Sequence, residues 1–556
     1  MKKNLLAIFL LFAFILQSSA LAQTATKPSS PSRKAAETIM ADGLKDYLYF
    51  VASDEMEGRD TPSRGLNLTA KFIALNLRHW GFKPAGDDGT FFQNIALDLH
   101  STDAETTQLS VGGQTIKYGR DFFSNPVAAT VADSPLVFAG SGWLLRSKNI
   151  DALKDVDVAG KTVVIYSGNF YPEGVTQADL FSGKLGKAGI DWMLPFDYAR
   201  QKGAAGLIII ASPKTEENWE MERQSREHGR ATVEKFAQTN SPRNRNPNNI
   251  PTMIISRDAA ENLFQGATTS LAEIFKLSQT DAPLPTVALG KTASYTVASK
   301  TEKGATQNVV AVWEGSDPTL KNEMVAVGAH YDHIGLSSPS SPNPDKINNG
   351  ADDDGSGTVS VLSIAEALAK SAKRPKRSIL LVWHCGEEKG LWGSQYFNKY
   401  PTIDIKKVVA QLNIDMIGRS RKPDDTNPKN ANLSAANEVY VIGSQMMSSK
   451  LGEVTKSIND SYLKLNYDLK YDDPKDPNRF FFRSDHFNYA LNGIPIIFWF
   501  DGVHEDYHQP GDEPQKIDYV KMQNIARTIF LTMWEVADLP ARPAVDKQLP
   551  PELTQR

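Results

Sequence analysis

The sequence has almost no cysteine and no marked excess of charge of either sign. Cys385 is the only cysteine among 556 residues, which excludes an intrachain disulfide. The formal net charge of −4 is small for this length and indicates neither a nucleic-acid-binding surface nor an acidic tail. Beyond the first 22 residues no apolar run approaches the ~20 residues of a spanning helix. We therefore expect no nucleic-acid partner and no stable membrane insertion.

The N-terminus reads "MKKNLLAIFLLFAFILQSSALAQ". Two lysines precede an apolar stretch from Leu5 to Leu16, and Ala20-Leu21-Ala22 follows, as at a cleavage site of a secretory signal peptide. A membrane anchor is the alternative, but it usually needs ~20 apolar residues. We expect a signal peptide over residues 1–22, a flexible Ser/Pro/Thr-rich leader over 23–34, and a protein exported to the periplasm or secreted.

The remaining chain is too long for one typical core, and its pattern changes twice. Helical patterns and short, continuous apolar runs alternate over residues 35–123 and 294–540. Such runs are typical of strands buried on both faces of a sheet. Residues 124–293 alternate short β-rich runs with Gly-rich loops. We expect a discontinuous α/β domain with a mostly parallel mixed sheet flanked by helices, a β-rich insert, and a tail over 541–556.

Ionisable side chains gather where the apolar runs of the α/β domain stop. Six of the nine histidines lie between His330 and His508. The run "MVAV" is followed by "GAHYDHIG", and "NNGADDDGSG" opens the next predicted helix. Adjacent aspartates repel one another unless a cation neutralises them. A calcium-binding EF-hand loop does not fit, because Val361 occupies the position that needs a glutamate.

Three further clusters follow later apolar runs. These are "HCGEEKGLWGS", "NIDMIG" and "GVHEDYHQPGD". Ligands in open α/β sheets bind beyond the carboxyl ends of strands, where these clusters would meet. Imidazole and carboxylate without thiolate suit zinc or a similar divalent ion, and carboxylates can bridge two ions ~3.5–4 Å apart. One of two adjacent glutamates can bind metal while the other acts as a general base.

These motifs, in this order, resemble the co-catalytic zinc exopeptidases that include secreted bacterial aminopeptidases and glutamate carboxypeptidases. The resemblance implies a zinc exopeptidase fold, a peptide substrate and two zinc ions per chain. By position, His330 and Asp415 would hold one zinc, Glu388 and His508 the other, and Asp353 both. The segments "KTVVIY", "ARQKGAAGLIIIAS" and "IPTMIISRDAAENL" resemble the protease-associated domain that is often inserted in this family.

The resemblance also assigns the other roles. Glu387 would be the general base, Asp332 would orient the imidazole of His330, and Tyr507 would stabilise the tetrahedral intermediate. The remaining histidines of the clusters have no ligand role in the family pattern and are expected to be structural or to support the ligands: His333, His384, His486 and His504. Cys385 is expected to be a small buried residue beside the site.

Several alternatives stay open at this stage. Asp352 or Asp354 could replace Asp353 as the bridge. The sequence favours an aminopeptidase, but a carboxypeptidase would need a cationic pocket that Arg483 or Arg479 could supply. A glutaminyl-peptide cyclotransferase has a related fold and overlapping ligands. A binding protein that has lost its metal is disfavoured, because all five ligand positions and the base are filled.

Overall fold

The computed structural model describes residues 27–166, 168, 171–175, 179–180, 184–237, 249–280, 284–338, 341, 343–444, 446–551 and 554. The predicted signal peptide lies outside these residues, so it stays a prediction. Within them, no helix has the length and apolar character needed to cross a membrane. Helix α2 already begins at Ser30, capped by the Ser29 side chain and with Pro31 in its first turn. The last part of the predicted leader is therefore helical.

The first lobe is built on a sheet whose described strands run in the order β12-β2-β15-β17-β16-β18-β21-β19-β20, with β1 beside β15. Its centre, β17-β16-β18-β21, is parallel, and antiparallel strands flank this centre on both sides. The bounds are β1 Lys83–Pro84, β2 Phe92–Thr102, β12 His228–Val233, β15 Ser299–Trp313, β16 Met324–His330, β17 Ser378–His384, β18 Val408–Ile414, β19 Glu438–Ile442, β20 Asn466–Asp468 and β21 Ile496–Phe500.

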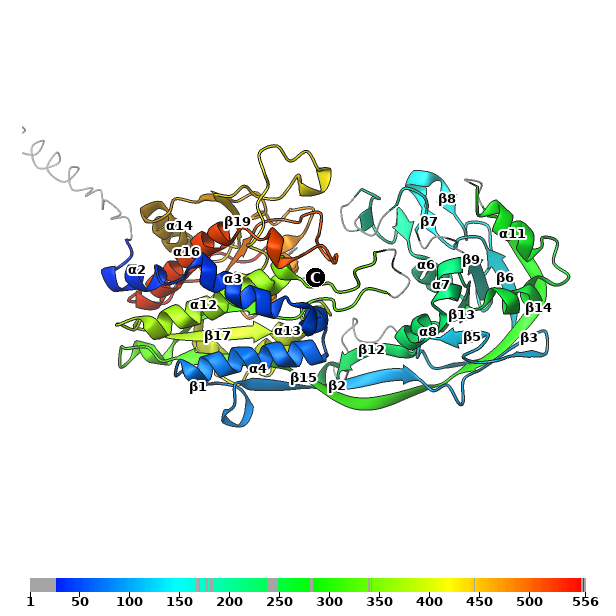
Figure 1. Ribbon diagram of the computed structural model, residues 1–556, viewed down its shortest axis with the longest axis horizontal. Coiled ribbons are helices and arrows are strands. Elements are labelled where there is room, and N and C mark those ends of the chain that lie inside the picture. The colour runs from blue at the N-terminus through cyan, green and yellow to red at the C-terminus, as the bar shows by residue number, and fades with distance from the viewer. Residues whose placement is uncertain are drawn as a thin grey trace, which may run out of the picture.

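Helices cover both faces of this sheet (Figure 1). Their bounds are α2 Ser30–Ala36, α3 Ala41–Val51, α4 Arg64–His79, α12 Gly357–Lys370, α13 Trp392–Lys399, α14 Ser449–Ser461, α15 His486–Leu491 and α16 Tyr519–Asp538. Alternate residues of β16 enter different cores: Val325 and Val327 pack in the core with α12 and α16, and Met324 and Ala326 pack in the core with α15. Burial on both faces explains why the strand sequences are continuously apolar.

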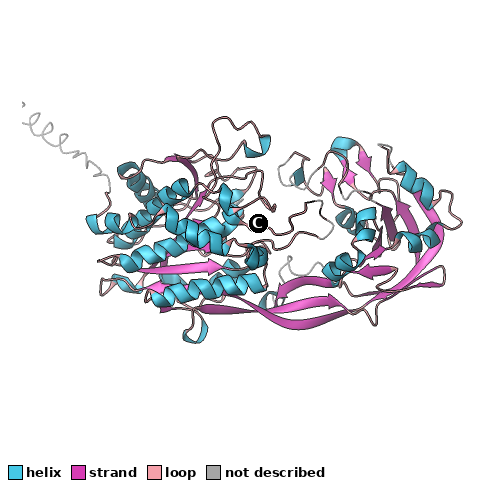
Figure 2. Ribbon diagram, viewed as in Figure 1, coloured by secondary structure: helices cyan, strands magenta, loops and turns pink. Residues whose placement is uncertain are grey.

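The second lobe has a separate mixed sheet in the order β4-β3-β14-β6-β9-β11-β13-β5. Figure 2 shows its strands and short helices beside the first lobe. The bounds are β3 Gln108–Val111, β4 Gln114–Ile116, β5 Phe122–Ser124, β6 Ala129–Ala139, β9 Thr162–Tyr166, β11 Gly206–Ile210, β13 Thr252–Ile255 and β14 Thr286–Val297, with α6 Pro195–Gln201, α7 Pro213–Glu217, α8 Trp219–Glu227, α9 Glu234–Ala237, α10 Arg257–Phe264 and α11 Leu271–Leu277. Strands β7 Leu144–Leu145, β8 Ile150–Asp151 and β10 Trp192–Met193 form a small third sheet.

The division between the lobes differs from the predicted limits at residues 124 and 293. Strands β3 and β4 precede residue 124 but belong to the second sheet, whereas β12 lies within the predicted insert and pairs with β2 of the first. The long strands β2 and β15 pair with each other and run from the first lobe toward the second (Figure 1). Local composition does not reveal such a switch, because pairing partners are chosen between segments distant in sequence.

The carboxyl ends of the central strands point toward the second lobe, as the arrow of β17 shows in Figure 1. The connection that follows β16 reaches that lobe: the Ser338 hydroxyl donates to Glu222 on α8 over 2.8 Å. Parallel pairing of β16 with both β17 and β18 brings their carboxyl ends to one edge of the sheet. The predicted clusters therefore meet at this edge.

Candidate metal centre

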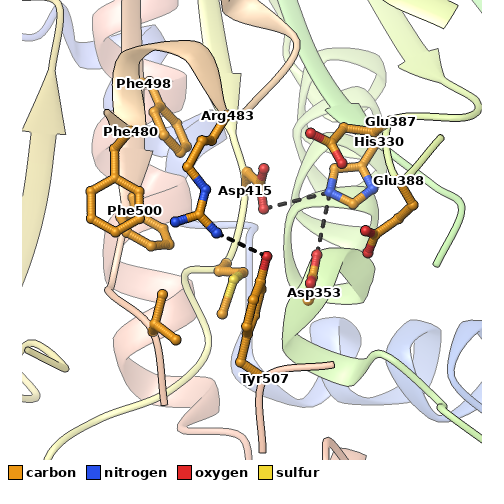
Figure 3. Close-up of a pocket in the computed structure, with 12 residues that line it drawn as sticks. His330, Asp353, Glu387, Glu388, Asp415, Phe480, Arg483, Phe498, Phe500 and Tyr507 are labelled. Atoms are coloured by element: carbon orange, nitrogen blue, oxygen red, sulfur yellow. Dashed lines mark hydrogen bonds and ion pairs between the residues drawn. The ribbon is translucent and has the colours of Figure 1, made fainter. Parts of the chain in front are cut away.

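The predicted site residues occupy the connections at the carboxyl edge of the first sheet. His330 ends β16 and Asp415 directly follows β18. Asp353 lies in the turn before α12, Glu388 follows β17, and His508 lies in the loop after β21. Figure 3 shows His330, Asp353, Glu388 and Asp415 lining one pocket. Residues from distant parts of the chain are thus brought together as the sequence predicts.

Asp353 lies between two groups of donors. Its Oδ1 is 3.4 Å from His330 Nε2, and Asp415 Oδ1 is 3.5 Å from the same nitrogen. Its Oδ2 is 3.1 Å from His508 Nε2, which is 3.2 Å from Glu388 Oε2. One carboxylate therefore faces both groups, which is the arrangement a bridging ligand needs.

The neighbouring aspartates are engaged elsewhere. Asp352 Oδ2 lies 3.3 Å from His504 Nε2, and its Oδ1 accepts the Gly418 N–H over 2.7 Å. Asp354 is close enough to His330 and Asp415 to share a cation with them. Its Oδ1, however, accepts the N–H of Gly357 at the start of α12 over 2.8 Å. Asp354 thus caps the start of this helix through its side chain.

The donor atoms fit a divalent cation. Within the described residues, the buried atoms Asp353 Oδ2, Glu388 Oε1 and His508 Nε2 make no hydrogen bond. Buried polar atoms are normally hydrogen-bonded, and a buried charge without compensation is costly. Imidazole nitrogens and carboxylate oxygens are ligands of zinc. The donor set therefore fits zinc.

Glu387 lies next to these donors and is held by Asp332. Its backbone N–H donates to Asp332 Oδ1 over 3.1 Å. Burial raises the pKa of Glu387 well above its usual value; the His330 charge opposes this shift, and the Glu388 charge adds to it. His330 Nδ1 lies 3.1 Å from the backbone oxygen of Asp332 and 3.7 Å from its carboxylate. The backbone oxygen of Asp332 is thus closer to His330 than its carboxylate is.

Tyr507 and Arg483 line the opposite side of the pocket (Figure 3). The Tyr507 ring stacks on that of His508 with 3.9 Å between centroids. Arg483 Nη2 donates to the Tyr507 hydroxyl over 3.2 Å. Arg479, the other candidate cation, instead lies over the ring of Phe482. The rest of this wall is apolar and consists of Met416, Phe480, Phe498, Phe500 and Val503.

Three of the four remaining histidines support the structure as expected. His384 Nε2 lies 3.2 Å from the Tyr489 hydroxyl, His486 stacks on Phe498, and His504 faces Asp352. His333 differs, because its Nδ1 lies 3.0 Å from Glu388 Oε1. Cys385 is buried with a free thiol, as expected.

Sequence reasoning missed Arg59, which is fully buried. Its guanidinium donates to the backbone oxygens of Tyr331 over 3.0 Å, Asn349 over 2.6 Å and Gly350 over 2.8 Å. Burial lowers the Arg59 pKa to about 10, although the charge of Asp512 opposes this shift, so the side chain remains cationic at pH 7. Arg59 thus joins the two loops that carry His330 and Asp353.

Asp512 was part of a quoted motif but was given no role. Its carboxylate accepts the backbone N–H groups of Asp352 over 3.0 Å and Asp353 over 3.1 Å. It thereby ties the aspartate turn to the loop that carries His508. No local pattern distinguishes Arg59 or Asp512 from an exposed charge, since their partners are main-chain atoms far away in sequence.

The chain is similar to known proteins over part of its length. Residues 308–533 match the model of "Peptidase family M28". The "Probable leucine aminopeptidase" of Arthroderma benhamiae is 29% identical over 228 residues, which are 40% of this chain and 56% of that protein. The "probable leucine aminopeptidase 2" of Aspergillus oryzae is 32% identical over 214 residues, 37% of this chain and 36% of that protein. The chain thus spans about half the length, or less, of these relatives.

A solved structure, "Aminopeptidase from Aneurinibacillus sp. strain AM-1", aligns with 93% of this chain and 98% of its own, at 15% identity and a TM-score of 0.49. The match at residues 308–533 covers the connections that carry all five predicted metal ligands. Over this segment the chain is similar to peptidase family M28.

Proposed function

We propose that the protein is an exported, zinc-dependent aminopeptidase that removes N-terminal residues from peptides. The observation that carries this proposal is the position of Asp353, whose two oxygens face two separate donor groups beside Glu387. The names of the relatives in family M28 agree with an aminopeptidase. Export rests on the predicted signal peptide alone, and detection of the mature protein outside the cytoplasm would test it.

His330 and Asp415 would hold one zinc, Glu388 and His508 the other, and Asp353 both. Zinc bound there would lower the pKa of a water toward ~7 and polarise the scissile carbonyl. Asp332 would keep Glu387 in place by accepting its backbone N–H. Asp512 would keep Asp353 in place in the same way. These contacts fix the ligands before substrate arrives, which reduces the cost of ordering them.

Glu387 would act as the general base and then as the general acid. Its carboxylate takes a proton from the attacking water and passes it to the leaving amine. The Tyr507 hydroxyl, oriented by Arg483, would donate to the oxygen that becomes negative during the attack. The proton from the water thus ends on the peptide nitrogen, and Glu387 regains its starting protonation state.

The pocket wall supports a preference for an apolar N-terminal side chain. Phe480, Phe498 and Phe500 form most of this wall, with Met416 and Val503. Apolar walls with a few placed polar groups are typical of small-molecule sites. The free α-amino group of the peptide would lie near Glu387 and Glu388, where negative charge favours it.

A carboxypeptidase is the second candidate, and Arg483 is the observation that favours it. Its guanidinium lines the pocket and could pair with a terminal carboxylate. However, Nη2 of this guanidinium already donates a hydrogen bond to the Tyr507 hydroxyl. A cyclotransferase would use the same pocket to release ammonia from N-terminal glutamine.

One experiment separates these functions. Purified protein is incubated with tripeptides that carry leucine at the first or the last position, and with a glutamine-first peptide, each with and without chelator. We expect release of the first leucine, no release of the last, no ammonia, and full loss with chelator. Release of the last residue would establish the carboxypeptidase, ammonia would establish the cyclotransferase, and activity in chelator would contradict the zinc requirement.

A further inference from the structure

His333 is a buried imidazole for which the proposed reaction gives no role. It follows β16 by three residues and is fully buried. Its Nδ1 lies 3.0 Å from Glu388 Oε1 and 3.8 Å from Asp353 Oδ2. Its ring meets that of His508 edge-on, with 5.5 Å between centroids. Among the described residues neither ring nitrogen has a hydrogen-bond partner. The side chain thus faces the donor group of Glu388 and His508.

The surrounding backbone fixes this ring. The His333 N–H donates to the Arg59 backbone oxygen over 3.2 Å. Gly350, with a φ of 58°, lies directly against the imidazole: a Cβ there would come within 2.5 Å of His333 Cγ. Only glycine permits so close an approach. The imidazole is therefore packed tightly between Gly350 and the carboxylates of Glu388 and Asp353.

The donor atoms around His508 lie within about 0.3 Å of the spacing expected around a single tetrahedral ion. Ligands ~2.0–2.2 Å from zinc are ~3.3–3.6 Å apart in a tetrahedron. His508 Nε2 is 3.1 Å from Asp353 Oδ2 and 3.2 Å from Glu388 Oε2. The two distances from His333 Nδ1, 3.0 and 3.8 Å, lie on either side of the same range. Around His330 Nε2, Asp353 Oδ1 lies at 3.4 Å and Asp415 Oδ1 at 3.5 Å. Asp354 is also near, but its Oδ1 accepts the Gly357 N–H at the start of α12.

We propose that His333 Nδ1 is a further ligand of the metal held by Glu388, His508 and Asp353. This inference rests on the proposed two-zinc function and deepens it, because it makes the two sites unequal. One ion would have four protein ligands and be held tightly. The other, at His330 and Asp415, would have three, which is typical of catalytic zinc that keeps a position open for water or substrate. The zinc at His330 would therefore leave first.

Two substitutions distinguish a ligand from a hydrogen-bond donor. In His333→Asn the amide nitrogen can still donate to Glu388 but is a poor zinc ligand, whereas His333→Ala removes both roles. Zinc content is measured after dialysis against increasing chelator, with the exposed His79→Asn as control. We expect two separate release steps in wild type and control. In both His333 variants the tighter step should weaken by ~100-fold or more, since even outer partners of a ligand contribute ~10–100-fold.

A second measurement uses the wild-type chain and does not depend on how the variants fold. X-ray absorption of the form that retains one zinc counts the imidazoles around it. We expect two, from His333 and His508, and a count of one overturns the inference. Release of zinc from His333→Asn at the same chelator concentrations as from wild type would also overturn the inference. If wild type hydrolyses peptides and binds two zinc ions, either result removes only the role of His333. Failure of wild type to bind two ions removes the proposed function as well.

Discussion

The two lobes have similar sheet centres but different strand ends. Strands β9, β11 and β13 of the second lobe are buried and parallel, like β16, β17 and β18 of the first. They end in Tyr166, Ile210 and Ile255, whereas β16 and β17 end in histidine and an aspartate follows β18. Both groups of potential metal ligands found among the described residues lie in the first lobe.

This difference shows that a parallel sheet supplies a place for a site and the residues after its strands supply the chemistry. The carboxyl edge is available in both lobes, but among the described residues the potential metal ligands gather only at that of the first. Substitutions in the first lobe can therefore be paired with matched substitutions in the second. Each pair tests whether a change in activity, zinc content or stability comes from the position of the side chain in the site. The substitution in the second lobe shows what loss of the same type of side chain does elsewhere.

The largest effect is expected for Asp353→Ala, which removes the carboxylate shared by both donor groups. Zinc should be lost from both positions and hydrolysis should fall to background. The stability that depends on zinc, about 4 kcal/mol when free zinc is 1,000 times Kd, should vanish from the melting curve. Asp258→Ala, at an exposed position of α10, should retain both ions. A zinc-loaded Asp353→Ala protein would place the bridge elsewhere.

Glu387→Gln keeps the size of the side chain but removes its capacity to accept a proton. The rate kcat should fall by about 10²–10⁴-fold, the usual contribution of a general base. Zinc content should remain near that of wild type, because Glu388 is unchanged. Turnover and metal content are measured on the same sample, with the exposed Glu261→Gln as the control. Wild-type turnover in Glu387→Gln would exclude it as the base.

Arg59→Met should affect folding more than chemistry. The substitution leaves buried backbone oxygens without a donor, and each such group costs about 1–3 kcal/mol. We expect a loss of at least about 3 kcal/mol in the free energy of unfolding, measured with denaturant, together with weaker zinc binding. Arg226→Met on the exposed face of α8 should change stability little. Equal stability of the two variants would show that Arg59 does not hold the loops.

The smallest effect is expected for Val503→Ala, which removes two methyl groups from the pocket wall. The kcat/KM for a leucine-first peptide should fall by about 10-fold, as one or two missing methyl groups in an apolar pocket usually cause. The kcat/KM for an alanine-first peptide should fall less. The measurement is therefore the ratio of kcat/KM for the leucine-first peptide to that for the alanine-first peptide. Val131→Ala in β6 of the second lobe is the control. An unchanged ratio would mean that this wall does not contact the first side chain.

Much of the first lobe could be predicted because its strands are continuous apolar runs. The apolar runs "MVAVGAH" and "SILLVWH" form the buried strands β16 and β17. The limits of the second lobe could not be predicted as well. Strand β12 follows the exposed helix α8 in sequence but pairs with β2 of the other sheet. Such pairing depends on a partner more than 100 residues away, which local composition does not reveal.

The residues that converge at the site could also be predicted, whereas the contacts that their individual atoms make could not. His330, Asp353, Glu388, Asp415 and His508 converge as expected. His333 was expected to be structural or to support a ligand, and it lies beside Glu388. Asp332 was expected to orient His330; its backbone oxygen lies 3.1 Å from His330 Nδ1, and its carboxylate accepts the Glu387 N–H. Rotamers and main-chain direction decide these contacts.

The sequence by itself determined which segments are buried strands and which of them end in imidazole or carboxylate. The strand order β17-β16-β18-β21, which differs from chain order, was decided only by tertiary pairing. That order brings side chains from separate connections within 4 Å of one another and leaves Arg59 buried between two of them. The physical reason is that a charge can remain inside the protein only where the whole fold supplies its partners.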